Sequence, residues 1–195
     1  MSFEKKEEAP ISKRKQRALE WLRKARERSG YEHDWFLSRK KKKIPLAFHT
    51  IGGTVIERLV RFGPYKFNIT MGKKEEQEIE KLDTLCICKG ESYSWIKKHF
   101  RVYQELKDQG LFPAFSPEDR YQFPEGLLER ALEERCLLNL LLIDGTLVQG
   151  VPIDMSVYSV LLKVPDAKGA QLLVFKHGVH QAELSSASKR KRISS

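Results

Sequence analysis

The chain has 195 residues, of which 41% are hydrophobic and 32% charged, so it can form one ordinary domain or two small ones around a modest core. It lacks an apolar run near the roughly 18 residues of a membrane span, lacks the apolar core of a secretory signal in MSFEKKEEAP, and has three cysteines, so we expect a cytoplasmic protein without a membrane partner. Its net charge of +10 favours an anionic partner, with nucleic acid ahead of a lipid surface.

The first half of the chain predicts helices followed by short strands. After a charged lead, Ser12 can cap a basic helix that ends at Gly30, and a second short segment, HDWFLSRKKKK, leads to Pro45. Gly-Gly and Gly-Pro turn signals then separate three strand-like runs, which are Leu46–Ile51, Thr54–Phe62 and Tyr65–Thr70. Gly72–Lys81 is predicted as a charged loop or a single helical turn, and Leu82–Lys89 as a further strand.

The second half follows a similar order. Tyr93–Asp108 is predicted as a helix, with Trp95, Phe100 and Tyr103 interpreted as its core side chains rather than as a stacking platform. A proline-containing linker and a short helix, Leu127–Arg135, come next. Four strand-like runs follow, which are Leu137–Ile143, Thr146–Pro152, Tyr158–Val164 and Gln171–His177. The basic end SSASKRKRISS is predicted to be disordered.

The repeated order of helix, glycine-turn hairpin, bent strand, loop and final strand indicates an internal duplication with a period of about 90 residues. About five short strands are too few for a stable open sheet with two exposed edges, so each set is predicted to close on itself. Gly150 and Pro152 within one strand favour the bend that closure needs. The predicted fold is mainly β with helices: two five-stranded, strongly bent small β-barrels, each preceded by an α-helix. A plain β-meander packed on the helices is the alternative.

Residues Leu138–Glu183 carry an Asp144-Gly145 turn, Gln149-Gly150 in the next strand, and a final Phe175-Lys176-His177 triplet. This order resembles the Sm-like barrel of the Hfq family of bacterial RNA chaperones, in which the triplet is Tyr-Lys-His. Residues His33–Gly90 resemble a weaker copy that keeps Lys89 and lacks the histidine. The resemblance implies a tandem, divergent Hfq-like protein. Its predicted segments are a basic N-terminal extension or helix (1–30), a degenerate Sm domain (31–91), a helical, Pro-rich linker (92–120), an Hfq-like Sm domain (121–184) and a basic disordered tail (185–195).

The resemblance also implies a uridine pocket, with a basic rim supplied by the first copy. In such a pocket a ring stacks on the base, glutamine and imidazole groups read the uracil edge, and lysine neutralises the phosphate. The pocket candidates are Gln122, Tyr158, Phe175, Lys176 and His177. The rim candidates are Arg39, Lys40, Lys41, Lys42, Lys43 and Lys89. Leu141 replaces the family's tyrosine on the second, A-rich-binding face, which puts purine binding there in doubt. His177 could instead make a structural hydrogen bond at a strand end.

The leading hypothesis is an RNA chaperone that binds U-rich single-stranded RNA in post-transcriptional regulation, without a cofactor or metal. We expect a homo-oligomer, such as a trimer that completes a ring of six barrels. The alternative is a scaffold that binds nucleic acid, DNA included, without reading bases. An enzyme is not expected, because the sequence lacks paired carboxylates beside a histidine, metal-ligand spacing and a phosphate-binding glycine loop. Cys86, Cys88 and Cys136 are too few for a zinc site.

Overall fold

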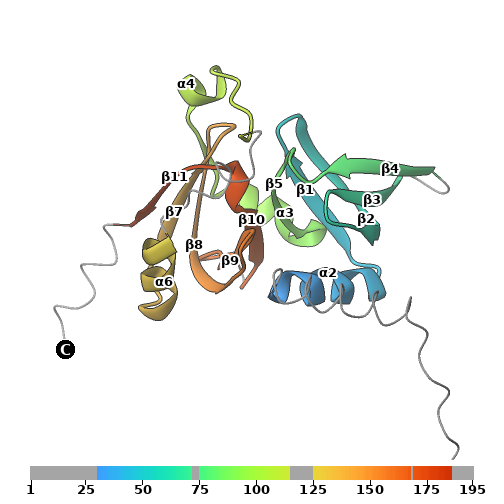
Figure 1. Ribbon diagram of the computed structural model, residues 1–195, viewed down its shortest axis with the longest axis horizontal. Helices are drawn as coiled ribbons and strands as arrows, with labels where there is room; N and C mark the ends of the chain where they lie inside the picture. The colour runs from blue at the N-terminus through green and yellow to red at the C-terminus, as the bar shows by residue number, and fades with distance from the viewer. Residues whose placement is uncertain (1–29, 72–74, 115–124, 168, 186–195) are drawn as a thin grey trace, which may run out of the picture.

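The computed structural model describes residues 30–71, 75–114, 125–167 and 169–185, and it is a mainly β protein with a few short helices (Figure 1). The elements are, in chain order, α2 (Tyr31–Lys41), β1 (Pro45–Thr50), β2 (Gly53–Phe62), β3 (Lys66–Met71), β4 (Glu75–Glu80), β5 (Thr84–Lys89), α3 (Gly90–Lys97), β6 (Arg101–Val102), α4 (Gln104–Lys107), α6 (Glu125–Glu133), β7 (Leu138–Leu142), β8 (Thr146–Met155), β9 (Ser159–Lys163), β10 (Gln171–Phe175), a 3-10 turn (Lys176–Gly178) and β11 (Val179–Leu184). Within these ranges, α2 is the longest helix, and none is long and apolar enough to cross a bilayer.

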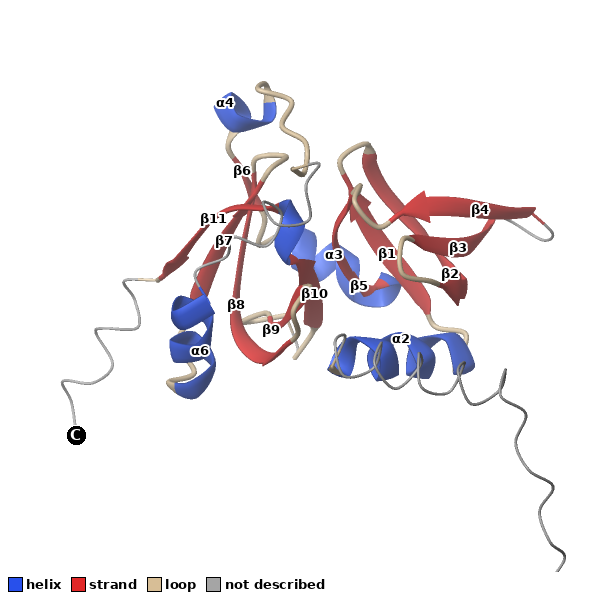
Figure 2. Cartoon of the chain, in the orientation of Figure 1, coloured by secondary structure: helices blue, strands red, loops and turns tan. Residues whose placement is uncertain are grey.

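The eleven strands of the described residues form one antiparallel sheet. Ten of them follow the order β11-β7-β8-β9-β10-β5-β1-β2-β3-β4, and β6 pairs with β8 beside this path. The sheet is open, with β11 and β4 at its two ends (Figure 2). The prediction of a mainly β fold with helices is therefore confirmed. The prediction that each strand set closes into its own five-stranded barrel is not confirmed, because the strands of the described residues form one open sheet.

The strands fall into two sets that share one internal order. In the first strand set, β1–β5, the fifth strand pairs with the first, so the order is β5-β1-β2-β3-β4. The second strand set, β7–β11, has the same order, β11-β7-β8-β9-β10. The sets meet where β10 pairs with β5, with Leu172 opposite Cys88 and Val174 opposite Cys86. We call this pairing of β5 with β10 the junction.

The junction strands are buried on both faces, because they separate two hydrophobic cores. The α2 core contains Trp35 and Phe36 of α2, and the α6 core contains Leu128 and Ala131 of α6. Side chains of β10 alternate between the two cores, as the pleat of a strand requires. Leu172 and Val174 lie in the α6 core, and Leu173 and Phe175 lie in the α2 core. Each strand set therefore contributes side chains to the core of the other.

The prediction of a loop or helical turn in Gly72–Lys81 is wrong for Glu75–Glu80, which form strand β4. Ile79 is buried opposite Phe67 on β3, so one apolar residue anchors the strand. Lys66 Nζ lies 2.7 Å from Glu78 Oε2 and 3.2 Å from Glu80 Oε1 across the same pair of strands. The charged composition conceals the strand because β4 is an end strand whose other side chains face solvent.

The single helix predicted for Tyr93–Asp108 is also wrong, because β6 divides it into α3 and α4. Arg101 and Val102 pair with the start of β8, and the Tyr103 amide donates to the Gly145 carbonyl at 2.8 Å. These bonds to the β7–β8 hairpin replace the helical bonds of the segment. Strand β11, which no predicted run covered, pairs with β7.

Two glycines of the second strand set allow close backbone approaches. Gly145 has a φ of 80° in the β7–β8 turn, and a Cβ there would collide with the Tyr103 carbonyl oxygen. Gly150 lies where β8 changes from pairing with β7 to pairing with β9, and a Cβ there would be 2.7 Å from the Leu162 Cβ. The register of β8 then shifts between Pro152 and Asp154. This is the place where the sequence predicts a bend.

Candidate nucleic-acid interface

Four of the five predicted uridine-pocket residues lie together at one end of the junction. Strand β10 ends at Phe175, and Lys176 and His177 form the 3-10 turn that leads into β11. The Lys176 amide donates to the Tyr158 carbonyl at 2.9 Å, which holds the start of β9 beside this turn. The fifth candidate, Gln122, lies outside the described residues.

His177 connects the two strand sets. Its Nε2 lies 3.0 Å from the carbonyl oxygen of Thr84 at the start of β5, so this nitrogen carries the proton and donates. Its ring stacks on Phe175, with centroids 5.4 Å apart and an interplanar angle of 21°. The exposed fractions are 2% for Phe175, 5% for Lys176 and 7% for His177. The hydrogen bond fits the structural interpretation of His177, and these rings offer little surface to a base.

Helix α2 makes side-chain contacts with both strand sets. The Glu32 carboxylate, which is buried, accepts a hydrogen bond from Ser159 Oγ at 2.9 Å and lies 3.4 Å from Lys81 Nζ. The Tyr31 hydroxyl lies 3.0 Å from the same Ser159 Oγ, and burial raises the pKa of this phenol above its ordinary value. These contacts fix α2, whose basic last turn then lies at the other end of the junction.

Arg39 is held rigidly in that last turn. Its guanidinium lies over the Trp35 ring at 4.0 Å from the centroid. Its Nη2 donates to Gln171 Oε1 at 3.1 Å, and its Nη1 donates to the Trp35 carbonyl at 3.3 Å. The Nε is buried without a hydrogen-bond partner among the described atoms. Burial lowers the pKa of Arg39 from its ordinary value, yet an arginine stays charged at neutral pH.

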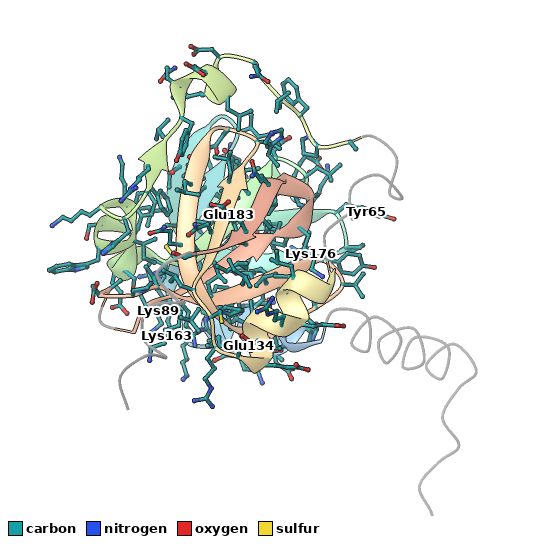
Figure 3. The ribbon with its side chains drawn as sticks, turned by 90° about the vertical axis from the view of Figure 1, so that its left-hand side faces the viewer. Tyr65, Lys89, Glu134, Lys163, Lys176 and Glu183 are labelled. Carbon is teal, nitrogen blue, oxygen red and sulfur yellow. The ribbon has the colours of Figure 1, made fainter. Side chains whose placement is uncertain are left out.

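A cavity of about 510 Å³ opens beside Arg39, and we call it the outer cavity. Its lining residues are Arg39, Lys89, Glu91, Ser92, Trp95, Ala167, Gly169, Ala170 and Gln171. Lys89 Nζ pairs with Glu91 Oε1 at 3.5 Å, and both side chains are exposed, so this ion pair is weak. Lys163, which pairs with Gln171 across β9 and β10, lies at the same end of the strands as Lys89 (Figure 3).

Trp95 and Tyr103 depart from the sequence-based interpretation as helix core. Trp95 on α3 is 44% exposed and lines the outer cavity, and Tyr103 is 50% exposed. Lys98 Nζ lies 4.8 Å from the centroid of the Trp95 ring. The polar neighbours of Trp95 on α3, with lysines at 97 and 98, are the sequence feature that indicates a surface position.

The predicted basic rim continues from Arg39. Lys40, Lys41, Lys42 and Lys43 are all exposed at the end of α2 and in the turn that follows it. No carboxylate of the described residues lies within ion-pair distance of these four lysines or of Arg39. The rim is therefore a patch of positive charge without a carboxylate partner among the described residues, and it adjoins the outer cavity through Arg39.

A row of hydrogen-bonded polar side chains also links the two strand sets, at the end of β1 that contains His49. His49 Nε2 lies 2.8 Å from Asp144 Oδ2, and His49 Nδ1 lies 3.0 Å from Thr54 Oγ1. Burial alone would raise the pKa of Asp144, but hydrogen bonds from His49 and Thr146 outweigh it and lower this pKa below its ordinary value. These hydrogen bonds hold the Asp144-Gly145 turn against β1.

The cysteines offer no metal chemistry within the described ranges. Cys86 and Cys88 are buried in the α6 core, and burial raises the pKa of the Cys88 thiol to about 12. No group of three or more His, Cys, Asp or Glu side chains in the described part of the chain could hold a metal ion. The free thiols of Cys86 and Cys88 are core side chains.

No family model matches the chain, and no curated protein or solved structure is significantly similar to it.

Proposed function

We propose that the protein binds U-rich single-stranded RNA through two Sm-like strand sets and acts, like Hfq, as an RNA chaperone in post-transcriptional regulation. The repeated strand order carries the proposal. Each set has five antiparallel strands with the fifth paired to the first, and each is preceded by a helix that packs into its own core. This strand order is the one expected of two strongly bent Sm-like units joined at the junction, although the sheet that they form is open.

The charge distribution supports an RNA partner. The chain carries a net charge of +10, and the five cations from Arg39 to Lys43 are concentrated on one helix end without described counter-charges. A phosphate backbone would neutralise them and relieve their mutual repulsion. Four pocket candidates converge on the junction, as a site formed between neighbouring barrels would require.

The second candidate function is a scaffold that binds nucleic acid without reading bases. The near-complete burial of Phe175 and His177 favours it, because a base would have to displace packed side chains before it could stack there. In this function the exposed rim attracts RNA and DNA alike through their phosphates. The two functions differ in base preference and in their dependence on His177.

Fluorescence anisotropy with short oligo(U), oligo(A) and mixed DNA at two salt concentrations tests the proposal. We expect oligo(U) to bind most tightly and His177→Ala to remove that preference. His180→Ala is the matched control, because His180 is exposed three positions further along. His177→Gln keeps a donor for the Thr84 carbonyl, so it separates loss of base reading from loss of folding. Equal binding of all three ligands, weakened together by salt and unchanged by both His177 variants, would establish the scaffold instead.

We also propose that the protein self-assembles through the two ends of its sheet. The junction pairs the fourth strand of one set with the fifth strand of the other, and the free ends, β4 and β11, are the remaining fourth and fifth strands. Repeating the contact between chains is a head-to-tail assembly, which closes into a ring if the rotation allows. Three chains would then bring six strand sets together.

The free ends differ from the junction in one respect that makes the assembly testable. Strand β4 presents four glutamates, whereas β10 is apolar, so pairing of the ends relies on backbone hydrogen bonds more than on burial. Native mass spectrometry should find three chains per particle. Glu76→Pro on β4 should dissociate them, because the alternation of the β3–β4 ladder directs the Glu76 amide to the free edge and proline removes that donor. A single-chain mass at all protein concentrations would contradict the assembly and leave the RNA proposal intact.

A further inference from the structure

We infer that the outer cavity binds one nucleotide unit, with Trp95 stacked on its base and Arg39 and Lys89 beside its phosphate. The inference rests on the proposed RNA-binding function and adds a second contact to it. The outer cavity lies at the Lys89 and Gln171 end of the junction, whereas the predicted uridine pocket lies at the His177 and Thr84 end. The two ends are separated by the length of β10, about 17 Å for five residues at 3.3–3.4 Å each.

The walls of the outer cavity come mainly from segments outside the two strand sets. Helix α3 supplies Ser92 and Trp95, and the loop between β9 and β10 supplies Ala167, Gly169 and Ala170. The volume of the outer cavity, about 510 Å³, falls in the range of roughly 300–1,000 Å³ that is common for small-molecule sites.

Arg39 supplies an oriented charge that has no counter-ion among the described residues. Both of its hydrogen-bond acceptors, the Gln171 amide and the Trp35 carbonyl, are neutral. Stacking on Trp35 and the bond to Gln171 hold the guanidinium in one orientation, so little freedom is lost when an anion binds. A phosphate accepts charge-assisted hydrogen bonds from such a group, and its charge would stabilise the partly desolvated cation.

Lys89 and Trp95 complete the site. The partner of Lys89 within the described part of the chain is an exposed carboxylate, and a phosphate can compete with such a weak ion pair. Trp95 is a large ring that remains 44% exposed among cations, with Lys98 near its face. An aromatic ring beside positive charges is the arrangement by which proteins hold single-stranded nucleic acid without strict sequence preference. The outer cavity is therefore expected to add affinity, not uracil specificity.

The test measures anisotropy of labelled oligo(U) and calorimetric titration with UMP, uridine and inorganic phosphate. Trp95→Ala is expected to weaken oligo(U) roughly 5- to 100-fold, the range for loss of one stacked base. Trp95→Phe should keep most of the affinity for oligo(U). Lys89→Gln should weaken the binding of oligo(U) and of inorganic phosphate together. Lys97→Gln is the charge-matched control, because Lys97 is exposed on α3 and does not line the outer cavity. Arg39→Lys keeps the positive charge but removes the planar guanidinium group, so it should weaken the binding of UMP.

The outcomes separate this inference from the proposed function. If oligo(U) binds the wild type and Trp95→Ala and Lys89→Gln leave its affinity unchanged, the inference is overturned, and the RNA proposal continues to rest on His177. If no RNA binds, the proposed function fails and the UMP titration decides alone. UMP binding that Trp95→Ala removes would then assign the outer cavity to a free nucleotide, and no UMP binding would overturn the inference.

Discussion

Replacing Leu173 with alanine should destabilise both strand sets at once. Leu173 belongs to β10 of the second set, yet its fully buried side chain lies in the α2 core, opposite Ile87 of β5 and Leu161 of β9. Leu→Ala substitutions in cores cost roughly 2–5 kcal/mol, the cost rising with the cavity that remains. Strands on both sides hold the backbone here and limit collapse, so we expect about 3 kcal/mol. For a chain of this size the melting temperature should fall by roughly 6–12 °C.

Far-UV circular dichroism gives the melting temperature, and hydrogen exchange with mass spectrometry locates the loss. Peptides from β2–β3 and from β7–β8 should lose protection by the same free energy, because both sets share the junction. Val157→Ala is the control, since Val157 is 51% exposed and its truncation should change stability by no more than about 0.5 kcal/mol.

Two outcomes would refute the shared-core argument. Protection lost only in β7–β8, with β2–β3 unchanged, would mean that the sets unfold independently. A fall in stability below about 1 kcal/mol would mean that Leu173 is not tightly packed.

Two further predictions concern the β7–β8 turn and use urea unfolding. Gly145→Ala should lower the free energy of unfolding by roughly 1–3 kcal/mol or more, because φ at this position is positive and the new Cβ would meet the Tyr103 carbonyl. The control is Gly126→Ala in α6, which faces open space and should raise the free energy of unfolding by roughly 0.5–1 kcal/mol. Similar effects of the two substitutions would contradict this prediction. The lowered pKa of Asp144 means that its carboxylate contributes stability above its ordinary pKa of 3.8, which is lost as pH falls through the folded value. Asp144→Asn should therefore cost roughly 1–3 kcal/mol at pH 7, and the difference from wild type should shrink at pH 3; a constant difference would show that the charge on Asp144 does not matter.

Local features of the fold were predictable from the sequence, and long-range ones were not. The hairpin at Gly52-Gly53 and the turn at Asp144-Gly145 form as predicted because a glycine turn depends on a few adjacent residues. Strand β4 was missed because strand prediction relies on apolar alternation, and Ile79 is its one buried residue.

The junction was beyond prediction because β5 and β10 lie far apart in the chain and no local pattern selects one partner over another. The apolar runs LCIC and LLVF do indicate strands that are buried on both faces, which is a usable sign of an interior position. The four described pocket candidates lie together, but sequence patterns do not report that Phe175 and His177 are buried. Whether these residues bind RNA stays a prediction.

The junction also imposes an order of events on synthesis of the chain. Strand β5 is made about 80 residues before β10, which at roughly 5–20 residues per second is a delay of several seconds. During that interval the nascent first strand set presents β5 as an unpaired apolar edge, which is the kind of surface that aggregates or recruits chaperones. Its opposite edge, β4, is already protected by glutamates. Slowed translation between Gly90 and Gln171 should therefore lower the yield of native protein more than the same slowing after Leu184.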